Sequence, residues 1–477
     1  MEREAASRFV SSTECGAIAQ RLAGALAIPT VSHTTPTVED DQAFLAFHKY
    51  LERSFPLVHG ALLREAVGQN HALLYSWKGS DPAAEPWLLS SHQDVVAGEA
   101  GLESNWTHPP FGGHIASGQI WGRGALDLKV MLVATLEAAE HLLARRFRPN
   151  RTIYFSFGGD EEIGGKRGAG KIAARLRAQG VRLGFTLDEG GIVLRDAIPG
   201  VKRPVAFIGV AEKGEVLLRL LAEDATGHSS MPAPTSAVGR LAHAVAAIED
   251  HPMRARLEPP ISDTFRYLAP HARPPYRQIY RYSRLFAPLL LRLLRHNPLA
   301  DALVRTTIVA SVVRAGESEN VIPATATALL HARLRPGDSV ADVVSHIRHL
   351  VAPHAVTVEI IESHEASRIS STDNQAFDLL CETIRDVMPD AVVAPCLSLN
   401  ATDSRHYESL ARNQYRFVPI RVGPEDLRRI HGVDECVSIE NYCGAVNFLI
   451  QFIRNADRAP STTVGAQPDA TARVGSE

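Results

Sequence analysis

Cysteine pairs at metal-binding or redox spacings are absent from this 477-residue chain. Its five cysteines are scattered along the sequence, and no CxxC motif occurs. This pattern gives no support for a thiolate zinc site or for the disulfide framework of a small secreted domain. We therefore expect reduced thiols, most of them buried.

An excess of basic charge is absent too. The chain has 50 lysines and arginines against 53 aspartates and glutamates, with the two signs interspersed and a formal net charge of -3. Without a basic stripe that could follow a phosphate backbone, we expect no nucleic-acid partner.

No apolar run is long enough to cross a membrane. The most apolar stretch, from Leu285 to Leu299, is too short for a span and is interrupted by Arg292 and Arg295. The opening segment MEREAASRFVSSTECGAIAQ lacks the basic region and apolar core of a secretory signal. These absences predict a cytoplasmic protein with no membrane partner.

What the sequence does have is the composition of a folded chain, with 45% apolar and 22% charged residues. Its length exceeds what one hydrophobic core usually organises, so more than one domain is expected. From about residue 13 to 205, helical stretches alternate with short apolar runs, which predicts an α/β layer with largely parallel strands. The same character returns from about residue 366.

Between these α/β segments the pattern reads β-α-β-β-α-β, which predicts a smaller inserted α+β domain. The predicted fold class is therefore α/β, with a discontinuous main domain over 1–208 and 364–457 and an inserted domain over 209–363. Within the latter, residues 251–305 are rich in Pro, Arg and Tyr and are expected to be a further insertion. The segment 458–477 has too few apolar residues to pack, so we expect it to be disordered.

Candidate metal ligands follow several of the apolar runs. In SSHQDVV, His92 and Asp94 lie two positions apart at the end of an expected strand, where they share a face. One could ligate a metal ion while the other orients it. The alternative is a hydrogen-bonded pair in the core.

Two loops add further candidates. In WGRGALDLK, Asp127 follows a glycine-rich approach that can aim a carboxylate into a cleft. It could equally cap the helix expected over 128–146. In RRIHGVDE, His431 lies in a loop ahead of the last helix and, taken alone, would be a structural histidine.

Two acidic clusters follow apolar strands and precede glycines. FGGDEEIGG sets Asp160, Glu161 and Glu162 side by side, and FTLDEGG repeats this design with Asp188 and Glu189. Adjacent acids repel one another unless a cation or a raised pKa relieves them. A solvated loop is the alternative explanation, but in FGGDEEIGG the glycines on both sides and the preceding apolar strand favour a functional role.

The candidates form a set of nitrogen and oxygen ligands without thiolates, all expected at one rim of the sheet. The set is His92, Asp127, Glu162, Asp188 and His431. Two zinc-like ions bridged by a carboxylate need about this many ligands, whereas a single ion would not.

Seven motifs in order carry a resemblance to a known family: SSHQDVV, WGRGALDLK, GGDEEIGG, LDEGG, GHSS, SENVIP and HGVDE. They resemble the di-zinc family of aminoacylase, glutamate carboxypeptidase, acetylornithine deacetylase and succinyl-diaminopimelate desuccinylase, over about residues 20 to 455. Within it the chain is most similar to the carboxypeptidase S and N-acyl amino acid hydrolase branch, through FHKYLERSFP, LDEGG and TTIVASVVRAGESENVIPATATALLHARLRPGD. The resemblance implies an α/β/α zinc-peptidase domain with a ferredoxin-like lid.

The resemblance also implies how metal is held. Two zinc ions per subunit are expected, although cobalt or manganese suits the same ligands. His92 and Asp188 would hold one ion and Glu162 and His431 the other. Asp127 would bridge them, ahead of a cis peptide bond to Leu128.

Further roles follow from the same resemblance. Glu161 would be the general base and Asp94 would support His92. His228 of GHSS would stabilise the oxyanion, which in dimeric relatives involves reaching across to the other subunit. Asn320 would contact the substrate, and Arg405 of NATDSRHY would pair with its free carboxylate. Taken alone, His228 would be a turn histidine and Arg405 a surface residue.

The activity implied is zinc-dependent hydrolysis of an amide bond next to a free carboxylate, in a dipeptide or an N-acyl amino acid. One alternative is a dipeptidase that recognises the free amine of its substrate. Another is a non-catalytic scaffold for ligand capture, although the intact ligand set argues against it. A homodimer through the lid is implied unless the insertion covers that surface.

Overall fold

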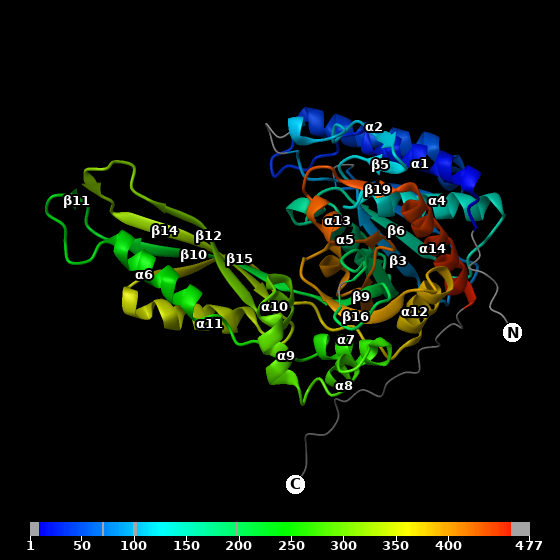
Figure 1. Ribbon diagram of the computed structural model, residues 1–477. Helices are drawn as coiled ribbons and strands as arrows, with labels where there is room; N and C mark the ends of the chain where they lie inside the picture. The colour runs from blue at the N-terminus through cyan, green and yellow to red at the C-terminus, as the bar shows by residue number, and fades with distance from the viewer. Residues whose placement is uncertain (1–8, 69–70, 99–102, 197, 459–477) are drawn as a thin grey trace, which may run out of the picture.

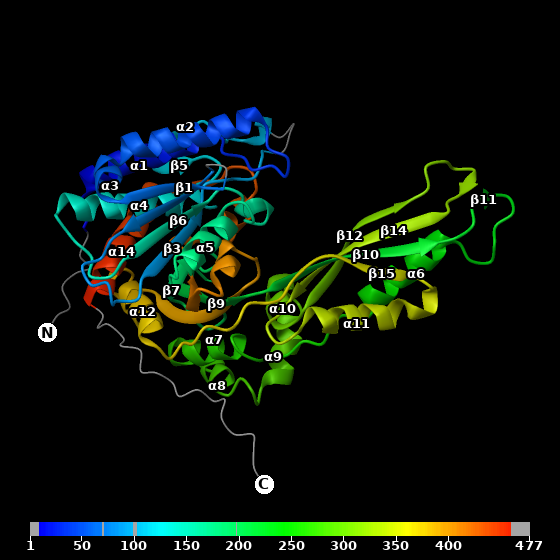
Figure 2. The ribbon, with the colours of Figure 1, turned by 180° about the vertical axis from the view of Figure 1, so that it is seen from behind.

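The computed structural model describes residues 9–68, 71–98, 103–196 and 198–458. A thick layered domain carries a narrow, elongated domain that projects from it (Figures 1 and 2). We call these the main domain and the lid. Of the segment predicted to be disordered, 458–477, only Arg458 is described, and the rest lies outside the described residues.

The main domain is built on a mixed sheet of ten strands. In spatial order these are β1 (Leu63–Val67), β2 (Ala72–Trp77), β6 (Ile153–Gly158), β3 (Trp87–His92), β7 (Leu183–Asp188), β17 (Ala411–Arg416), β9 (Val205–Glu212), β8 (Val193–Leu194) and β18 (Arg421–Val422), with β16 (Val392–Ser398) paired to β9. The central strands β6, β3, β7 and β17 are parallel. Antiparallel pairs join β1 to β2, β2 to β6, and β9 to β17 and β8. The predicted, largely parallel arrangement is therefore confirmed at the centre of the sheet. Beyond the centre the sheet is mixed, because β16 on β9 and β18 on β8 are parallel while the other pairs are antiparallel.

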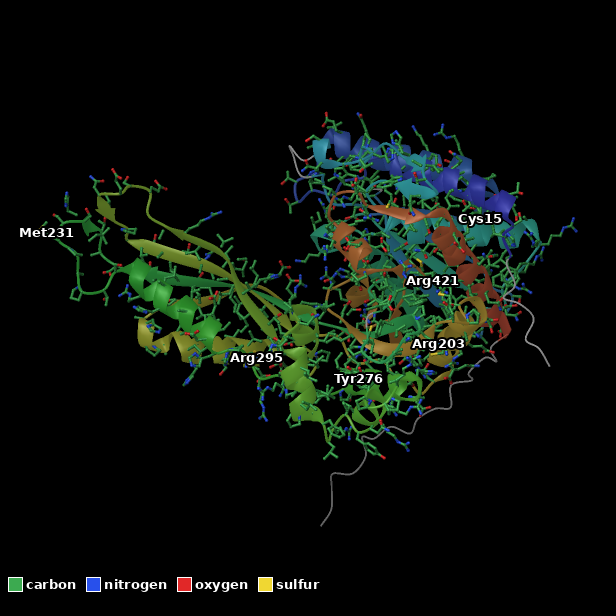
Figure 3. All side chains as sticks on the ribbon, viewed as in Figure 1. Cys15, Arg203, Met231, Tyr276, Arg295 and Arg421 are labelled. Atoms are coloured by element: carbon green, nitrogen blue, oxygen red, sulfur yellow. A yellow bond between two sulfur atoms is a disulfide. The ribbon has the colours of Figure 1, made fainter. Side chains whose placement is uncertain are left out.

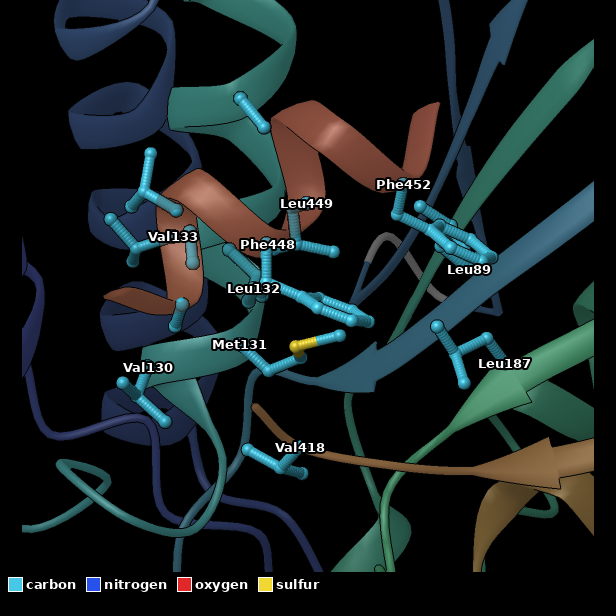
Figure 4. Close-up of a cluster of buried hydrophobic side chains, with 14 of the residues drawn as sticks. Leu89, Val130, Met131, Leu132, Val133, Leu187, Val418, Phe448, Leu449 and Phe452 are labelled. Atoms are coloured by element: carbon cyan, nitrogen blue, oxygen red, sulfur yellow. The ribbon is translucent and has the colours of Figure 1, made fainter. Parts of the chain in front are cut away.

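Helices cover both faces of this sheet. One face carries α1 (Ser12–Leu26), α4 (Lys129–Ala144), α12 (Gln375–Val387) and α14 (Ile439–Arg458), and α5 (Ala169–Ala178) covers the other. Figure 4 shows Leu89 of β3 and Leu187 of β7 packed near Met131 of α4 and Phe448 of α14. Because β3 is buried on both faces, its sequence WLLSSH carries no alternation of polar and apolar residues. The α/β/α fold class is confirmed.

The lid is a four-stranded antiparallel sheet with two helices on one face. Its strand order is β12 (Thr307–Ala315), β14 (Thr325–Leu334), β10 (Gly214–Glu223) and β15 (Thr357–His364), and its helices are α6 (Ala237–Asp250) and α11 (Val340–Val351). Alternate residues of β10 and β14 are buried against the helices, as period-two patterning requires. The predicted β-α-β-β-α-β order and its ferredoxin-like topology are confirmed. Because β9 of the main sheet runs to Glu212, the lid begins at about residue 213 rather than 209.

The insertion at 251–305 packs on the main domain. It forms four α-helices, α7 (Ile261–Leu268), α8 (Tyr276–Arg281), α9 (Ala287–Leu294) and α10 (Pro298–Val304), and one 3-10 helix, η3 (Ala269–His271). Phe265 and Leu268 share a core with Val392 and Leu397 of β16, and Thr264 Oγ1 donates to the carbonyl of Pro395 at 2.7 Å. No helix among the described residues has the length and apolar character needed to cross a bilayer.

A disulfide bond joins Cys15 of α1 to Cys443 of α14. The two residues are 428 positions apart in the sequence, with Cα atoms 5.9 Å apart. The expectation that all the cysteines are reduced is therefore wrong for this pair, because sequence spacing carries no sign of which helices pack together. Cys381, Cys396 and Cys436 are free.

Candidate metal centre

Three parallel strands bring the first residues of the site to one edge of the sheet. Strand β3 ends at His92, which lies opposite Gly158 at the end of β6. The segment 160–162, which we call the DEE loop, follows β6 after Gly159, and β7 ends at Asp188 beside it. Because parallel strands share their carboxyl edge, residues distant in sequence meet there.

Asp127 lies between two histidines. Its Oδ1 is 3.1 Å from Nε2 of His92, and its Oδ2 is 3.1 Å from Nε2 of His431. The peptide bond from Asp127 to Leu128 is cis, as the resemblance implied. Asp127 does not cap α4, since the residue before that helix is Leu128 and no side chain makes the cap hydrogen bond. The cap alternative is therefore excluded.

Three glutamates complete the cluster. His431 Nε2 lies 3.2 Å from Oε2 of Glu162, and His92 Nε2 lies 3.5 Å from Oε1 of Glu189. Two overlapping groups can each hold a metal ion with ligand atoms within 4.8 Å of one another. They are His92, Asp127 and Glu162, and His92, Glu161 and Glu189.

The LDEGG motif thus contributes Glu189 to the cluster, one residue beyond the predicted Asp188. Asp188 ends β7 and belongs to neither metal-binding group. Its Oδ1 accepts a hydrogen bond from the backbone N–H of Glu189 at 3.0 Å. Adjacent residues of an extended chain point to opposite sides, so the two acids of this motif cannot share one direction. The sequence alone gave no means of choosing between them.

The cluster shifts the pKa values of its members strongly. Burial and the negative charge of Asp127 raise the pKa of Glu189 to about 8. Burial and the charge of Glu189 raise the pKa of Glu161 well above its usual range. Hydrogen bonds to Asp127 and Glu162 raise the pKa of His431 to about 10. Acids packed this closely favour a shared cation.

Asp94 supports both His92 and the DEE loop. His92 Nδ1 donates to the backbone carbonyl of Asp94 at 2.8 Å, and the Asp94 carboxylate lies 3.5 Å from the same nitrogen. The two oxygens of Asp94 also accept from the backbone N–H groups of Glu161 and Glu162, at 3.2 and 3.1 Å. One buried carboxylate therefore positions two parts of the site.

Glu435, the last residue of the HGVDE motif, holds the loop that carries Asp127. Its Oε1 accepts from the backbone N–H groups of Gly124, Leu126 and Asp127 at 2.7 to 3.1 Å. Its Oε2 accepts from Arg123 Nη1 at 2.8 Å, and both side chains are buried. No role for Glu435 was predicted from the sequence, although its place in the same motif as His431 was a signal that could have pointed to one.

Arg405 lies beside the DEE loop. It belongs to a 3-10 helix, η5 (Asp403–Tyr407), and a side chain added at Gly164 would come within 3.6 Å of its Nη2. Its neighbour Asp403 is buried, and neither of its carboxylate oxygens has a hydrogen-bond partner among the described residues. Burial raises the pKa of Asp403 well above its usual range.

His228 and Asn320 lie together at the far end of the lid. His228 is exposed in β11 (Gly227–His228), and the backbone N–H of Ser229 donates to the carbonyl of Asn320 at 3.1 Å. Figures 1 and 2 show β11 at the tip of the lid, remote from β3. The structure brings these two residues together, but not to the metal cluster.

The donor set fits zinc. Imidazole nitrogens and carboxylate oxygens are its usual protein ligands where thiolates are absent. The Oε1 atom of Glu162 is buried and has no hydrogen-bond partner among the described residues, which leaves it free for a cation. The ring orientation of His92 is fixed by its contact with Asp94, as is usual for a ligating histidine.

Comparison with known proteins agrees with this geometry. A model of peptidase family M20/M25/M40 matches residues 88–455. The chain is 39% identical over 464 residues to the N-fatty-acyl-amino acid synthase/hydrolase PM20D1 of Mus musculus, covering 96% of this chain and 92% of that protein. It is 30% identical over 488 residues to carboxypeptidase S of Saccharomyces cerevisiae, covering 92% and 84% respectively.

Solved structures share the fold. The M20 family metallo-carboxypeptidase Sso-CP2 from Sulfolobus solfataricus has a TM-score of 0.67 at 20% identity, covering 92% of this chain and 98% of that one. Human carnosine dipeptidase 1 has a TM-score of 0.65 at 15% identity, covering 94% and 97%. The family model matches most of the chain, and the mouse and yeast relatives are 39% and 30% identical to it. This protein therefore belongs to peptidase family M20/M25/M40, in the branch of carboxypeptidase S and the N-acyl amino acid hydrolases.

Proposed function

We propose that the protein is a zinc-dependent hydrolase that cleaves the amide bond of an N-acyl amino acid, next to the free carboxylate. The observation that carries this proposal is the position of Asp127, with one oxygen toward each of two histidines and Glu161 in the same cluster. These residues would hold two cations, and cations held there would supply the activation of a water molecule.

Two zinc ions would be held by residues of this chain. His92 and Glu189 would bind one ion and Glu162 and His431 the other, with Asp127 bridging them. Glu189 takes the place predicted for Asp188, because the Glu189 carboxylate faces His92. When bound, the ions supply Lewis-acid polarisation of the amide carbonyl and of water. Cobalt or manganese suits the same donors.

Glu161 would move the proton. As a carboxylate beside the cations, it accepts a proton from the attacking water and delivers it to the leaving amine nitrogen. The backbone N–H of Glu161 is fixed by Asp94, so this side chain starts from a defined position. Because the general base is already positioned before the reaction, less entropy is lost in reaching the transition state, and the activation free energy is lower.

Arg405 would bind the free carboxylate of the substrate. A guanidinium matches a carboxylate through two parallel hydrogen bonds, and this one lies next to the DEE loop. His228 and Asn320 would act on the substrate only after the lid closes, or from the lid of a second copy in a homodimer. Closure would also exclude water from the site.

An N-acyl amino acid is preferred over a free dipeptide on the basis of the relatives. The mouse relative is named for N-fatty-acyl-amino acids and the yeast relative for carboxypeptidase activity. Both names describe substrates with a free carboxylate and no need for a free amine. A dipeptidase would need a group that recognises the substrate amine.

The test is hydrolysis of a panel of N-acyl amino acids, amino-blocked dipeptides and free dipeptides by the zinc-loaded protein. Glu161→Gln should lose about 100-fold or more in kcat while still binding zinc. Glu52→Gln, on the exposed surface of α2 (Val38–Ser54), is the matched control and should match the wild type. Turnover of free dipeptides alone would favour the dipeptidase, and no turnover of any substrate with zinc bound would favour a ligand-binding scaffold.

A further inference from the structure

The insertion presents apolar side chains to solvent at one edge of the molecule. We use the name α8–α9 surface for Tyr276, Tyr282, Leu285, Leu289 and Leu293, all of which are exposed. Leu285 is 77% exposed and Leu293 is 56% exposed, which is high for leucine. Several large apolar side chains are thus exposed within one short segment. Exposed leucines that occur singly are normal and need no explanation, but a group of them does.

The surface belongs to a well-packed element. Leu290 of α9 is buried in the core shared with β16, while Leu289 and Leu293, one turn apart, remain on the other side of the helix. The outward leucines therefore do not result from a loose segment. They are held outward by the packing of the opposite face.

Positive charge surrounds these side chains. From residue 264 to 300 the sequence has seven arginines and no aspartate, glutamate or lysine. Six of these arginines are exposed and form no ion pair with the described residues: Arg273, Arg277, Arg281, Arg284, Arg292 and Arg295. The two acids that bound this stretch, Asp263 and Asp301, are paired with Arg266 and Arg305. The surface thus combines apolar groups with unpaired cations.

The α8–α9 surface lies at the outer edge of the molecule. Figures 1 and 2 show α8 and α9 at the lower edge of the molecule, on the side away from α1 and α2. Figure 3 labels Tyr276 and Arg295 on this side. A flat partner could approach this edge without meeting the lid tip.

We propose that the α8–α9 surface docks the protein onto an anionic lipid bilayer. Leucines enter the boundary between headgroups and acyl chains, tyrosines lie at the headgroup level, and arginines pair with lipid phosphates and carboxylates. The earlier expectation of no membrane partner followed from the lack of a spanning segment, which does not bear on surface docking.

The charge argues against the other occupants. In a twofold dimer the same patch meets itself, so the unpaired arginines of one copy would face those of the other. A nucleic acid would use the arginines but leave the leucines in water. Only a partner that offers both anionic and apolar groups satisfies the whole surface, and an anionic bilayer does so.

The experiment measures binding of the full-length protein to phosphatidylcholine vesicles with and without phosphatidylserine, by co-sedimentation at several salt concentrations. It needs no turnover, so its outcome is independent of the proposed hydrolase activity. We expect binding to the phosphatidylserine vesicles that weakens as salt rises.

Two variants separate the contributions. Arg284→Gln/Arg292→Gln/Arg295→Gln should lose roughly fivefold in affinity per arginine and most of the salt dependence. Leu285→Ser/Leu289→Ser/Leu293→Ser should lose about tenfold or more. The matched control is Leu45→Ser/Leu57→Ser/Leu63→Ser, three exposed leucines of the main domain outside the insertion, which should bind like the wild type. Circular dichroism and melting curves confirm that each variant is folded.

Three results would overturn the proposal. The first is wild-type protein that stays in solution with phosphatidylserine vesicles, and the second is an equal loss of binding in the control. The third is a lipid-free dimer that the Leu285/Leu289/Leu293 variant converts to monomer in sedimentation velocity runs, since the surface would then bind a second copy.

Discussion

Asp127 holds its two carboxylate oxygens at the same distance, 3.1 Å, from Nε2 of His92 and Nε2 of His431. The two histidines come from distant parts of the chain, one at the end of β3 and the other ahead of the last helix. A carboxylate that faces two imidazoles in this way can give one oxygen to each of two ions. Asp127 therefore lies at the centre of the site. Each of the other candidate ligands is assigned to one of the two ions according to the histidine that it faces.

The ligand from LDEGG can be identified by zinc content. We expect Glu189→Gln to bind one zinc ion fewer than the wild type and to lose about 100-fold or more in activity, because Glu189 faces His92. Asp188→Asn should keep both ions and lose at most about 100-fold, as expected for a residue that supports a ligand. The measurement is metal analysis after dialysis together with hydrolysis rates. Because Oδ2 of Asp188 is buried without a partner among the described residues, the opposite pattern would identify Asp188 as the ligand.

Glu435 should control metal affinity without touching the metal. Glu435→Gln keeps an acceptor for the backbone N–H groups of Gly124, Leu126 and Asp127 but loses the charge that pairs with Arg123. We expect zinc affinity to fall by about 10- to 100-fold. Glu435→Ala should also lower the free energy of unfolding by about 3 to 5 kcal/mol, since it removes the acceptor of the three backbone N–H groups as well as the carboxylate of buried Arg123. Competition with a chelator and denaturant titration would measure the two effects; unchanged zinc affinity in both variants would contradict a positioning role.

Zinc binding should release protons and strengthen with pH. In the chain alone the pKa of Glu189 is raised to about 8 and that of His431 to about 10. At neutral pH both groups therefore hold protons that a cation must displace, so affinity increases as pH rises toward these values. We expect a gain of roughly tenfold per pH unit for each proton displaced. Calorimetric titration in buffers with different enthalpies of protonation counts the protons, and a pH-independent affinity would show that the acids are already ionised.

Much of the fold and of the candidate site can be predicted from the sequence, because the patterns that indicate them lie within short segments of the chain. Glycine-flanked acids after apolar strands mark the site, and period-two patterning marks the lid strands. The choice between Asp188 and Glu189 depends on the direction of two adjacent side chains at a strand end, which no local pattern specifies. The Cys15–Cys443 bond depends on the packing of α1 against α14 across 428 positions. Likewise, the composition of residues 251–305 indicated an insertion but not that it packs on β16 of the main domain.

Recognition of the substrate carboxylate gives the last prediction. Arg405→Lys keeps the positive charge but removes the planar pair of donors that matches a carboxylate. We therefore expect KM for N-acyl amino acids to rise about tenfold or more, with a smaller change in kcat. The same compounds with the carboxylate converted to an amide should be poor substrates for both proteins and should not distinguish them. Steady-state kinetics on both series measure this, with Arg412→Lys, an exposed arginine of β17, as the matched control. If Arg405→Lys lowered kcat equally for acids and amides, Arg405 would support the DEE loop instead of binding the substrate, since a loop displaced beside Gly164 would affect every substrate alike.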